Sequence, residues 1–110
     1  MTLNEYQQSA AEFMNKDIGS AEQLLHALFG MASEVGELHG IYQKFYQGHP
    51  IDEEHCMKEL GDILWMISEY ATVMGISLND VAHMNIAKLT ARYPDGFRVA
   101  DSLNRKEGDI

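Results

Sequence analysis

The 110-residue sequence has little cysteine and few basic residues. Its single cysteine, Cys56, excludes an internal disulfide and leaves no C-x-x-C pair for zinc or redox chemistry, so we expect it to act as a small buried hydrophobic residue. Eight Lys and Arg against 17 Asp and Glu give a formal net charge of −9. That balance argues against nucleic-acid binding, because basic surfaces supply most of the affinity for nucleic acids.

Long hydrophobic runs are also missing. No stretch approaches the roughly 18 apolar residues that indicate a membrane-spanning helix. The start, MTLNEYQQ, has neither the basic residues nor the apolar run of a secretion signal. We therefore expect no membrane partner and a cytoplasmic location. The chain does have 45% hydrophobic residues, which is enough for the core of one domain.

Apolar residues recur at helical spacing along nearly the whole chain, and no alternating strand pattern competes with them. Capping residues and breakers predict helices over about residues 2–14, 20–47, 52–75 and 77–94. The fold class is therefore all-α, with the architecture of a four-helix bundle. Residues 98–110 are polar and unpatterned, and we expect them to form a surface-packed or frayed tail after the domain of residues 1–97.

Two pairs of acids lie within apolar stretches, each one helical turn apart: Glu34 with Glu37, and Glu59 with Asp62. At about 100° per residue, both pairs project from the apolar face of their helix. On the second expected helix the acids share their face with Ala27, Met31, Leu38, Ile41 and Phe45, and the apolar stripe of this helix also includes Leu24, Leu28 and Val35.

Buried carboxylates are costly unless they are paired, protonated or bound to a cation. The two pairs are separated by 21 residues that include the break Gly48-His49-Pro50, so an antiparallel hairpin would bring them together. Hard divalent cations prefer carboxylate oxygens, which makes Glu34, Glu37, Glu59 and Asp62 candidate ligands of Mg²⁺, or of Mn²⁺ in its place. The alternative is a solvated acidic face with lysine partners.

The fourth expected helix carries a neutral amide and two cations on one face. Asn85, Lys88 and Arg92 share this face with apolar residues, and such a set can hold phosphate oxygens. The alternative is that both cations form ion pairs with core acids. Lys44 is a further candidate for the phosphates and His26 for the nucleotide pocket, although an exposed lysine and a structural histidine are the more ordinary cases. Trp65 lies off the acid face, and we assign it to packing or a subunit contact.

These residues resemble a known family. The pattern E-x-x-E, 21 residues, E-x-x-D, followed by N-x-x-K-L and R-Y-P-x-G-F, is similar to the MazG-like branch of the all-α nucleoside triphosphate pyrophosphohydrolases, in its short single-domain form. The resemblance covers about residues 1–97. It implies that the four acids bind Mg²⁺, and that a nucleoside triphosphate is cleaved between its α and β phosphorus to a monophosphate and pyrophosphate. It also implies that Asn85 lies near the metals and that Lys88 and Arg92 lie near the phosphates.

Metal ions that bridge the phosphates would activate a water for in-line attack on the α phosphorus. The catalytic carboxylate that takes its proton is Glu37 or Glu34, and we favour Glu37. Two other functions stay open: a phosphoribosyl-ATP pyrophosphatase-like enzyme, which shares the fold and acidic motifs, and a non-catalytic nucleotide-binding or regulatory module. A di-iron carboxylate bundle is excluded because it requires Glu-x-x-His, which does not occur here.

The length of the second expected helix predicts an oligomer. Residues 20–47 would extend roughly 42 Å, whereas a compact domain of this size is only about 34 Å across. The overhanging turns include Tyr42, Phe45 and Tyr46, which a partner subunit would cover. We expect a homodimer or homotetramer, unless Gly30, Gly36 and Gly40 break the helix.

Overall fold

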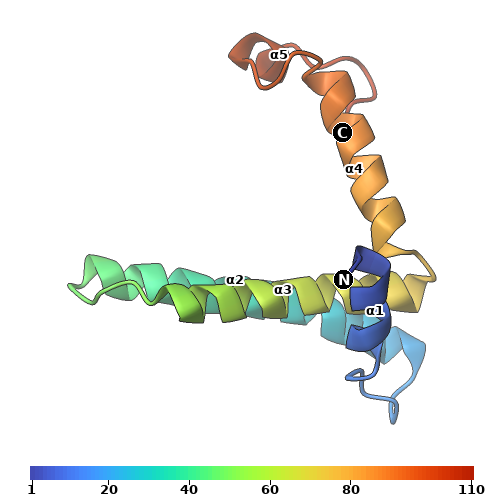
Figure 1. Ribbon diagram of the computed structural model, residues 1–110, viewed down its shortest axis with the longest axis vertical. Helices are drawn as coiled ribbons and strands as arrows, with labels where there is room; N and C mark the ends of the chain where they lie inside the picture. Colours follow the sequence, from blue (N-terminus) through green and yellow to red (C-terminus); the bar gives the residue numbers. More distant parts are fainter. The chain divides into compact units, whose positions relative to one another are not determined.

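The computed structural model describes residues 1–110 and contains five helices and no strand (Figure 1). The all-α fold class is therefore confirmed. The helices are α1 (Leu3–Ala11), α2 (Ser20–Tyr46), α3 (Glu53–Met74), α4 (Leu78–Arg92) and α5 (Val99–Leu103). None of them combines the length and apolar character that crossing a membrane requires. The chain divides into two compact units, residues 1–77 and residues 78–110.

Side chains cap α1 and α3 where the sequence predicts it. Thr2 accepts a hydrogen bond from the backbone N–H of Glu5 at 3.1 Å, and Asp52 accepts one from His55 at 3.1 Å. Gly75 ends α3 in the left-handed conformation, with φ of 70°, which glycine adopts without steric cost. α1 ends at Ala11, earlier than expected, and single turns continue to Met14.

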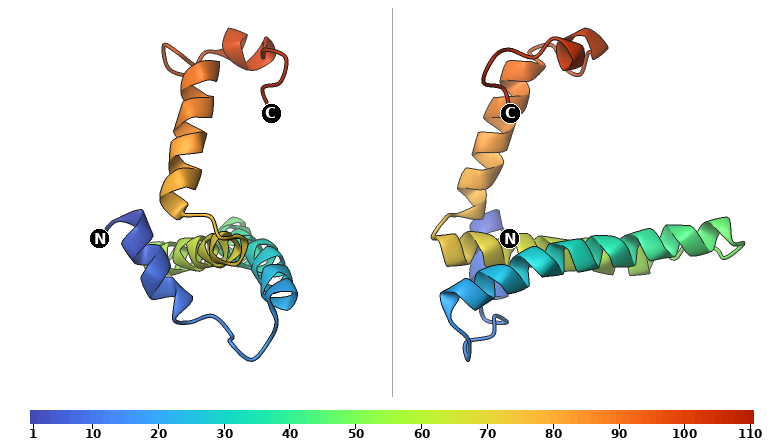
Figure 2. Two further views of the ribbon diagram at one scale, coloured as in Figure 1. Left: turned by 90° about the vertical axis from the view of Figure 1, so that its right-hand side faces the viewer. Right: turned by 180° about the vertical axis from the view of Figure 1, so that it is seen from behind.

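In the first unit, α2 runs antiparallel along α3, and α1 lies across α3 (Figures 1 and 2). Gln7 ties α1 to the end of α3 by donating to the carbonyl of Ile76 at 2.9 Å and to the Thr72 hydroxyl at 3.2 Å. Gly30 permits the close approach of α2 and α3, because a Cβ at this position would collide with the Met66 side chain. α2 is continuous through all three glycines, so the expected long helix is confirmed and the alternative of a break at the glycines is not.

The core of the first unit is thin. Ala27, Ile41, Met66 and Ala71 are buried between the helices. Part of the apolar face predicted to turn inward is not buried by this chain: Leu28 is 43% exposed, Val35 37% and Phe45 47%. The helical spacing identifies the apolar face correctly, but two helices in contact cover only a narrow strip of each other.

The second unit consists of α4, α5 and the segments that follow them. The rings of Tyr93 and Phe97 lie 5.2 Å apart between centroids, in the turn that leads from α4 to α5. After α5, residues 104–110 return to the end of α4. The segment expected to be a tail is thus surface-packed and partly helical rather than frayed.

Candidate metal centre

Three of the four predicted acids come together. Glu34 on α2 and Glu59 and Asp62 on α3 each offer a carboxylate oxygen, and these oxygens lie within 4.8 Å of one another. Glu59 and Asp62 are one turn apart on α3, and the antiparallel packing of α2 brings Glu34 to the same place. We call Glu34, Glu59 and Asp62 the acid cluster.

The acid cluster has more negative charge than the protein itself balances. Glu59 is buried; one of its oxygens contacts His55 Nε2 at 3.0 Å, and the other, Oε2, is buried without a hydrogen-bond partner. Burial raises the pKa of Glu34 above its ordinary value, and the adjacent Glu59 carboxyl group, which favours the protonated form, and the negative charges of Asp62, Glu59 and Glu37 raise it further. A proton or a cation is required to satisfy these oxygens.

An apolar hollow of about 460 Å³ lies against Asp62, between α1 and α3. Tyr6, Phe13 and Trp65 supply aromatic walls, and the indole N–H of Trp65 is buried without a partner. Burial and, to a lesser degree, the negative charge of Asp62 raise the pKa of the Tyr6 hydroxyl. The carboxylate of Asp62 thus stands at the edge of a hollow that has aromatic surface.

Glu37 is not part of the acid cluster. It is exposed and lines a second, more polar hollow of about 430 Å³, together with Lys44, His49, Asp52 and His55. Lys44 makes no ion pair, and it lies in this hollow two turns beyond Glu37 on α2. Glu37 is therefore the predicted acid whose carboxylate is most open to solvent.

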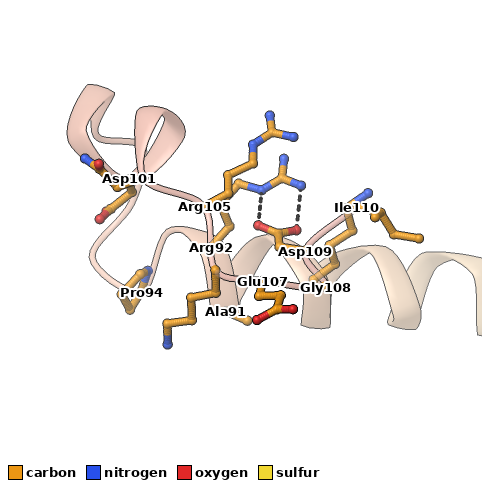
Figure 3. A pocket seen from close by; sticks show the side chains of 12 residues that line it. Ala91, Arg92, Pro94, Asp101, Arg105, Glu107, Gly108, Asp109 and Ile110 are labelled. Atoms are coloured by element: carbon orange, nitrogen blue, oxygen red, sulfur yellow. Dashed lines mark hydrogen bonds and ion pairs between the residues drawn. The ribbon is translucent and has the colours of Figure 1, made fainter.

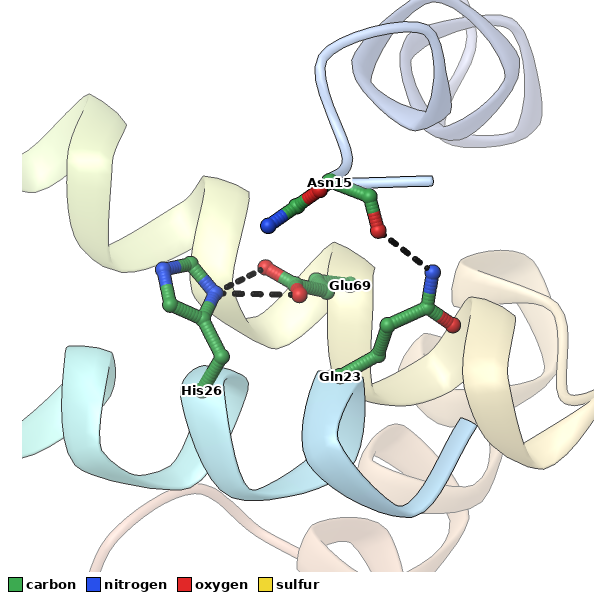
Figure 4. Close-up of polar contacts among 4 residues, drawn as sticks. All are labelled: Asn15, Gln23, His26 and Glu69. Atoms are coloured by element: carbon green, nitrogen blue, oxygen red, sulfur yellow. Dashed lines mark hydrogen bonds and ion pairs between the residues drawn. The ribbon is translucent and has the colours of Figure 1, made fainter. Parts of the chain in front are cut away.

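His26 contacts a buried acid that sequence reasoning missed. Its Nδ1 lies 3.0 and 2.9 Å from the two oxygens of Glu69 on α3, so the side chains of α2 and α3 point toward each other (Figure 4). Glu69 follows Asp62 by seven residues, which places it on the same face of α3. This seven-residue spacing is the sequence feature from which Glu69 could have been predicted to lie on the inner face of α3. The contact gives His26 a structural role, and its predicted contact with a nucleotide stays untested.

The three predicted phosphate ligands lie on α4, in the second unit. Asn85 and Lys88 are exposed, whereas the Arg92 side chain is 10% exposed and forms a two-pronged ion pair with Asp109, with N–O distances of 2.8 and 2.7 Å (Figure 3). The Arg92 guanidinium holds the pKa of the Asp109 carboxyl group below its ordinary value. The partner of Arg92 is thus an acid near the end of the chain, not a core acid, and no motif in the sequence predicted it.

The family model of the MazG nucleotide pyrophosphohydrolase domain matches residues 20–97, which is most of the chain. The chain belongs to the MazG family. The MazG match includes the whole acid cluster, Glu37 and the three candidate residues of α4.

One curated relative of this MazG protein is the Gene 37 protein of Mycobacterium phage L5, which is 28% identical over 94 residues. The alignment covers 81% of this chain and 82% of the phage protein. No solved structure matches the chain. Membership of the MazG family implies a nucleotide substrate, and the acid cluster is a group that could hold a metal ion.

Proposed function

We propose that this MazG protein is a Mg²⁺-dependent nucleoside triphosphate pyrophosphohydrolase, for which Mn²⁺ can substitute. The observation that supports the proposal most directly is the acid cluster with the unpartnered buried oxygen of Glu59. An oxygen-only donor set of this kind fits a hard divalent cation. The substrates of a nucleotide pyrophosphohydrolase family carry phosphates that such a cation can bind.

In this proposal Glu34, Glu59 and Asp62 hold the cation, and Glu37, one turn from Glu34, can join them. A bound Mg²⁺ would neutralise phosphate charge and lower the pKa of a coordinated water. Glu37 is exposed and outside the acid cluster, so its carboxylate is free to accept the proton of the attacking water. The water oxygen forms a bond to the α phosphorus, the bond from that phosphorus to the bridging oxygen breaks, and pyrophosphate leaves.

The remaining residues bind and orient the substrate. Lys44 lines the polar hollow beside Glu37, and we propose that it contacts the leaving phosphates. Asn85, Lys88 and Arg92 of α4 serve the phosphates as the sequence predicts, provided that Arg92 releases Asp109. The aromatic hollow beside Asp62 is the surface in the first unit on which a base can stack.

We also propose that the protein works as a homodimer or homotetramer. α2 spans about 40 Å in a single piece, and its apolar side includes exposed Leu25, Leu28 and Phe29, while α3 adds exposed Leu60. Burial of such a surface against a second copy is favourable at about 25 cal/mol per Å². Light scattering at micromolar concentration checks this: we expect two or four times 12.4 kDa, and a mass of one chain would refute it.

A panel of nucleoside triphosphates, incubated with Mg²⁺ or Mn²⁺, tests the function and identifies the preferred base and sugar. We expect at least one to yield a monophosphate and pyrophosphate. Preferential turnover of phosphoribosyl-ATP would favour the phosphoribosyl-ATP pyrophosphatase alternative. Nucleotide binding without turnover under either metal would show a non-catalytic module instead.

A further inference from the structure

Two buried glutamates of α3 are each contacted by a half-exposed histidine. Glu59 is paired with His55, and Glu69 is paired with His26. The side-chain exposures are similar, at 52% and 11% for the first pair and 53% and 1% for the second. The chain thus contains the same pair of residue types twice, once inside the acid cluster and once outside it.

The two pairs differ in how much of the carboxylate they use. His26 Nδ1 lies within 3.0 Å of both oxygens of Glu69, so both oxygens have a partner. His55 Nε2 contacts only Oε1 of Glu59, at 3.0 Å, and leaves Oε2 buried without one. An unsatisfied buried oxygen is costly, so the second arrangement makes sense only if another group meets Oε2.

We propose that His55 is a positioning residue that holds Glu59 for cation binding. In this arrangement the His55 Nε2–H donates to Oε1 and fixes the rotamer of the carboxylate, which leaves the buried Oε2 for the cation. The Nε2–H is present in the protonated imidazole and in one of the two tautomers of the neutral ring, so a charged ring is not required. The inference rests on the metal site of the proposed function and adds a residue to it.

The fold favours this role. His55 precedes Glu59 by four residues on α3, which places the two side chains one above the other on the same face. Asp52 caps α3 by accepting from the backbone N–H of His55, so the backbone that carries the imidazole is fixed as well. Partners that hydrogen-bond to metal ligands typically contribute tenfold to a hundredfold to metal affinity.

The test measures Mn²⁺ binding to the full chain in the absence of nucleotide. Electron paramagnetic resonance quantifies the free ion. We expect His55→Ala to weaken Mn²⁺ binding by about tenfold, and His55→Gln to restore most of it, because the glutamine amide can donate to Oε1. His26→Ala is the matched control. It removes the other histidine–glutamate pair, and we expect its Mn²⁺ affinity to equal that of the wild type.

Thermal unfolding of the metal-free variants separates folding from binding. If His55→Ala unfolds at the assay temperature, the comparison of His55→Gln with His55→Asn, whose amide is too short to reach Oε1, decides the matter. Wild-type affinity in His55→Ala, or in His55→Asn, would overturn the inference, and so would an equal loss in His26→Ala. Because no nucleotide is present, a loss of Mn²⁺ affinity supports the inference even if the protein cleaves no triphosphate, which is the result that would refute the proposed function.

Discussion

The acid cluster and Arg92 are both predicted to contact the metal–nucleotide complex, but the acid cluster lacks a counter-charge whereas Arg92 is already paired with Asp109. In the acid cluster, three carboxylates approach one another and one buried oxygen has no partner. At the end of α4, Arg92 and Asp109 satisfy each other with two short hydrogen bonds. An unbalanced site attracts a counter-ion, whereas a balanced one must first give up its partner. The comparison teaches that the acid cluster still needs a counter-ion, whereas Arg92 already has one.

The largest expected effect comes from neutralising the unbalanced site. Glu59→Gln removes a proposed ligand and should lower the metal-dependent rate at least a hundredfold. It also removes a buried charge that lacks a full set of partners, so the metal-free protein should be as stable as the wild type or more stable. Activity assays and metal-free thermal unfolding measure the two effects.

Glu69→Gln is the matched control, because Glu69 is equally buried but fully paired with His26. We expect this variant to lower the metal-free unfolding temperature. If Glu59→Gln destabilises the metal-free protein as much as Glu69→Gln does, the acid cluster is a structural feature and not a binding site.

The second effect is the pH dependence of the acid cluster. The folded-state pKa of Glu34 is raised, so between its ordinary value of 4.5 and the raised value the native state binds more protons than the unfolded state. The contribution of Glu34 to stability is therefore fully present below that interval and falls as pH rises through it. We expect denaturant titrations to show that, as pH rises through this interval, the metal-free wild type loses stability relative to metal-free Glu34→Gln. A difference that does not change with pH would contradict this.

The smallest effect concerns the balanced pair. Asp109→Asn removes the carboxylate that competes with phosphate for Arg92, so we expect a few-fold lower KM for the nucleotide at similar kcat. Glu107→Gln changes a neighbouring acid that makes no ion pair with Arg92, and should leave KM unchanged. An unchanged KM in Asp109→Asn would mean that Arg92 does not bind phosphate.

Helices α1 to α4 and the three members of the acid cluster could be predicted because local spacing indicates them, whereas α5 lies in the segment expected to be a tail. Capping residues fix where α1 and α3 begin, and the one-turn spacing of Glu59 and Asp62 fixes their common face. Other features depend on how helices that are distant in the sequence pack against each other. Sequence spacing placed Glu37 on the same face as Glu34, but the crossing of α2 and α3 leaves it outside the acid cluster.

Two further residues escaped prediction for a similar reason. The return of Asp109 to Arg92 depends on a 17-residue separation that no periodicity describes. Leu28 belongs to the apolar stripe by helical spacing but is 43% exposed, because tertiary packing decides how wide a strip of α2 is covered. Local pattern therefore gives the faces of the helices, and packing decides which residues on each face are in contact.

Hydrolysis in ¹⁸O-labelled water tests the central claim most directly. With Mg²⁺ and a triphosphate that the protein cleaves, attack at the α phosphorus places the label in the nucleoside monophosphate and leaves pyrophosphate unlabelled, as ³¹P nuclear magnetic resonance can show. We predict that result. Label in pyrophosphate, or formation of a diphosphate and inorganic phosphate, would contradict the account.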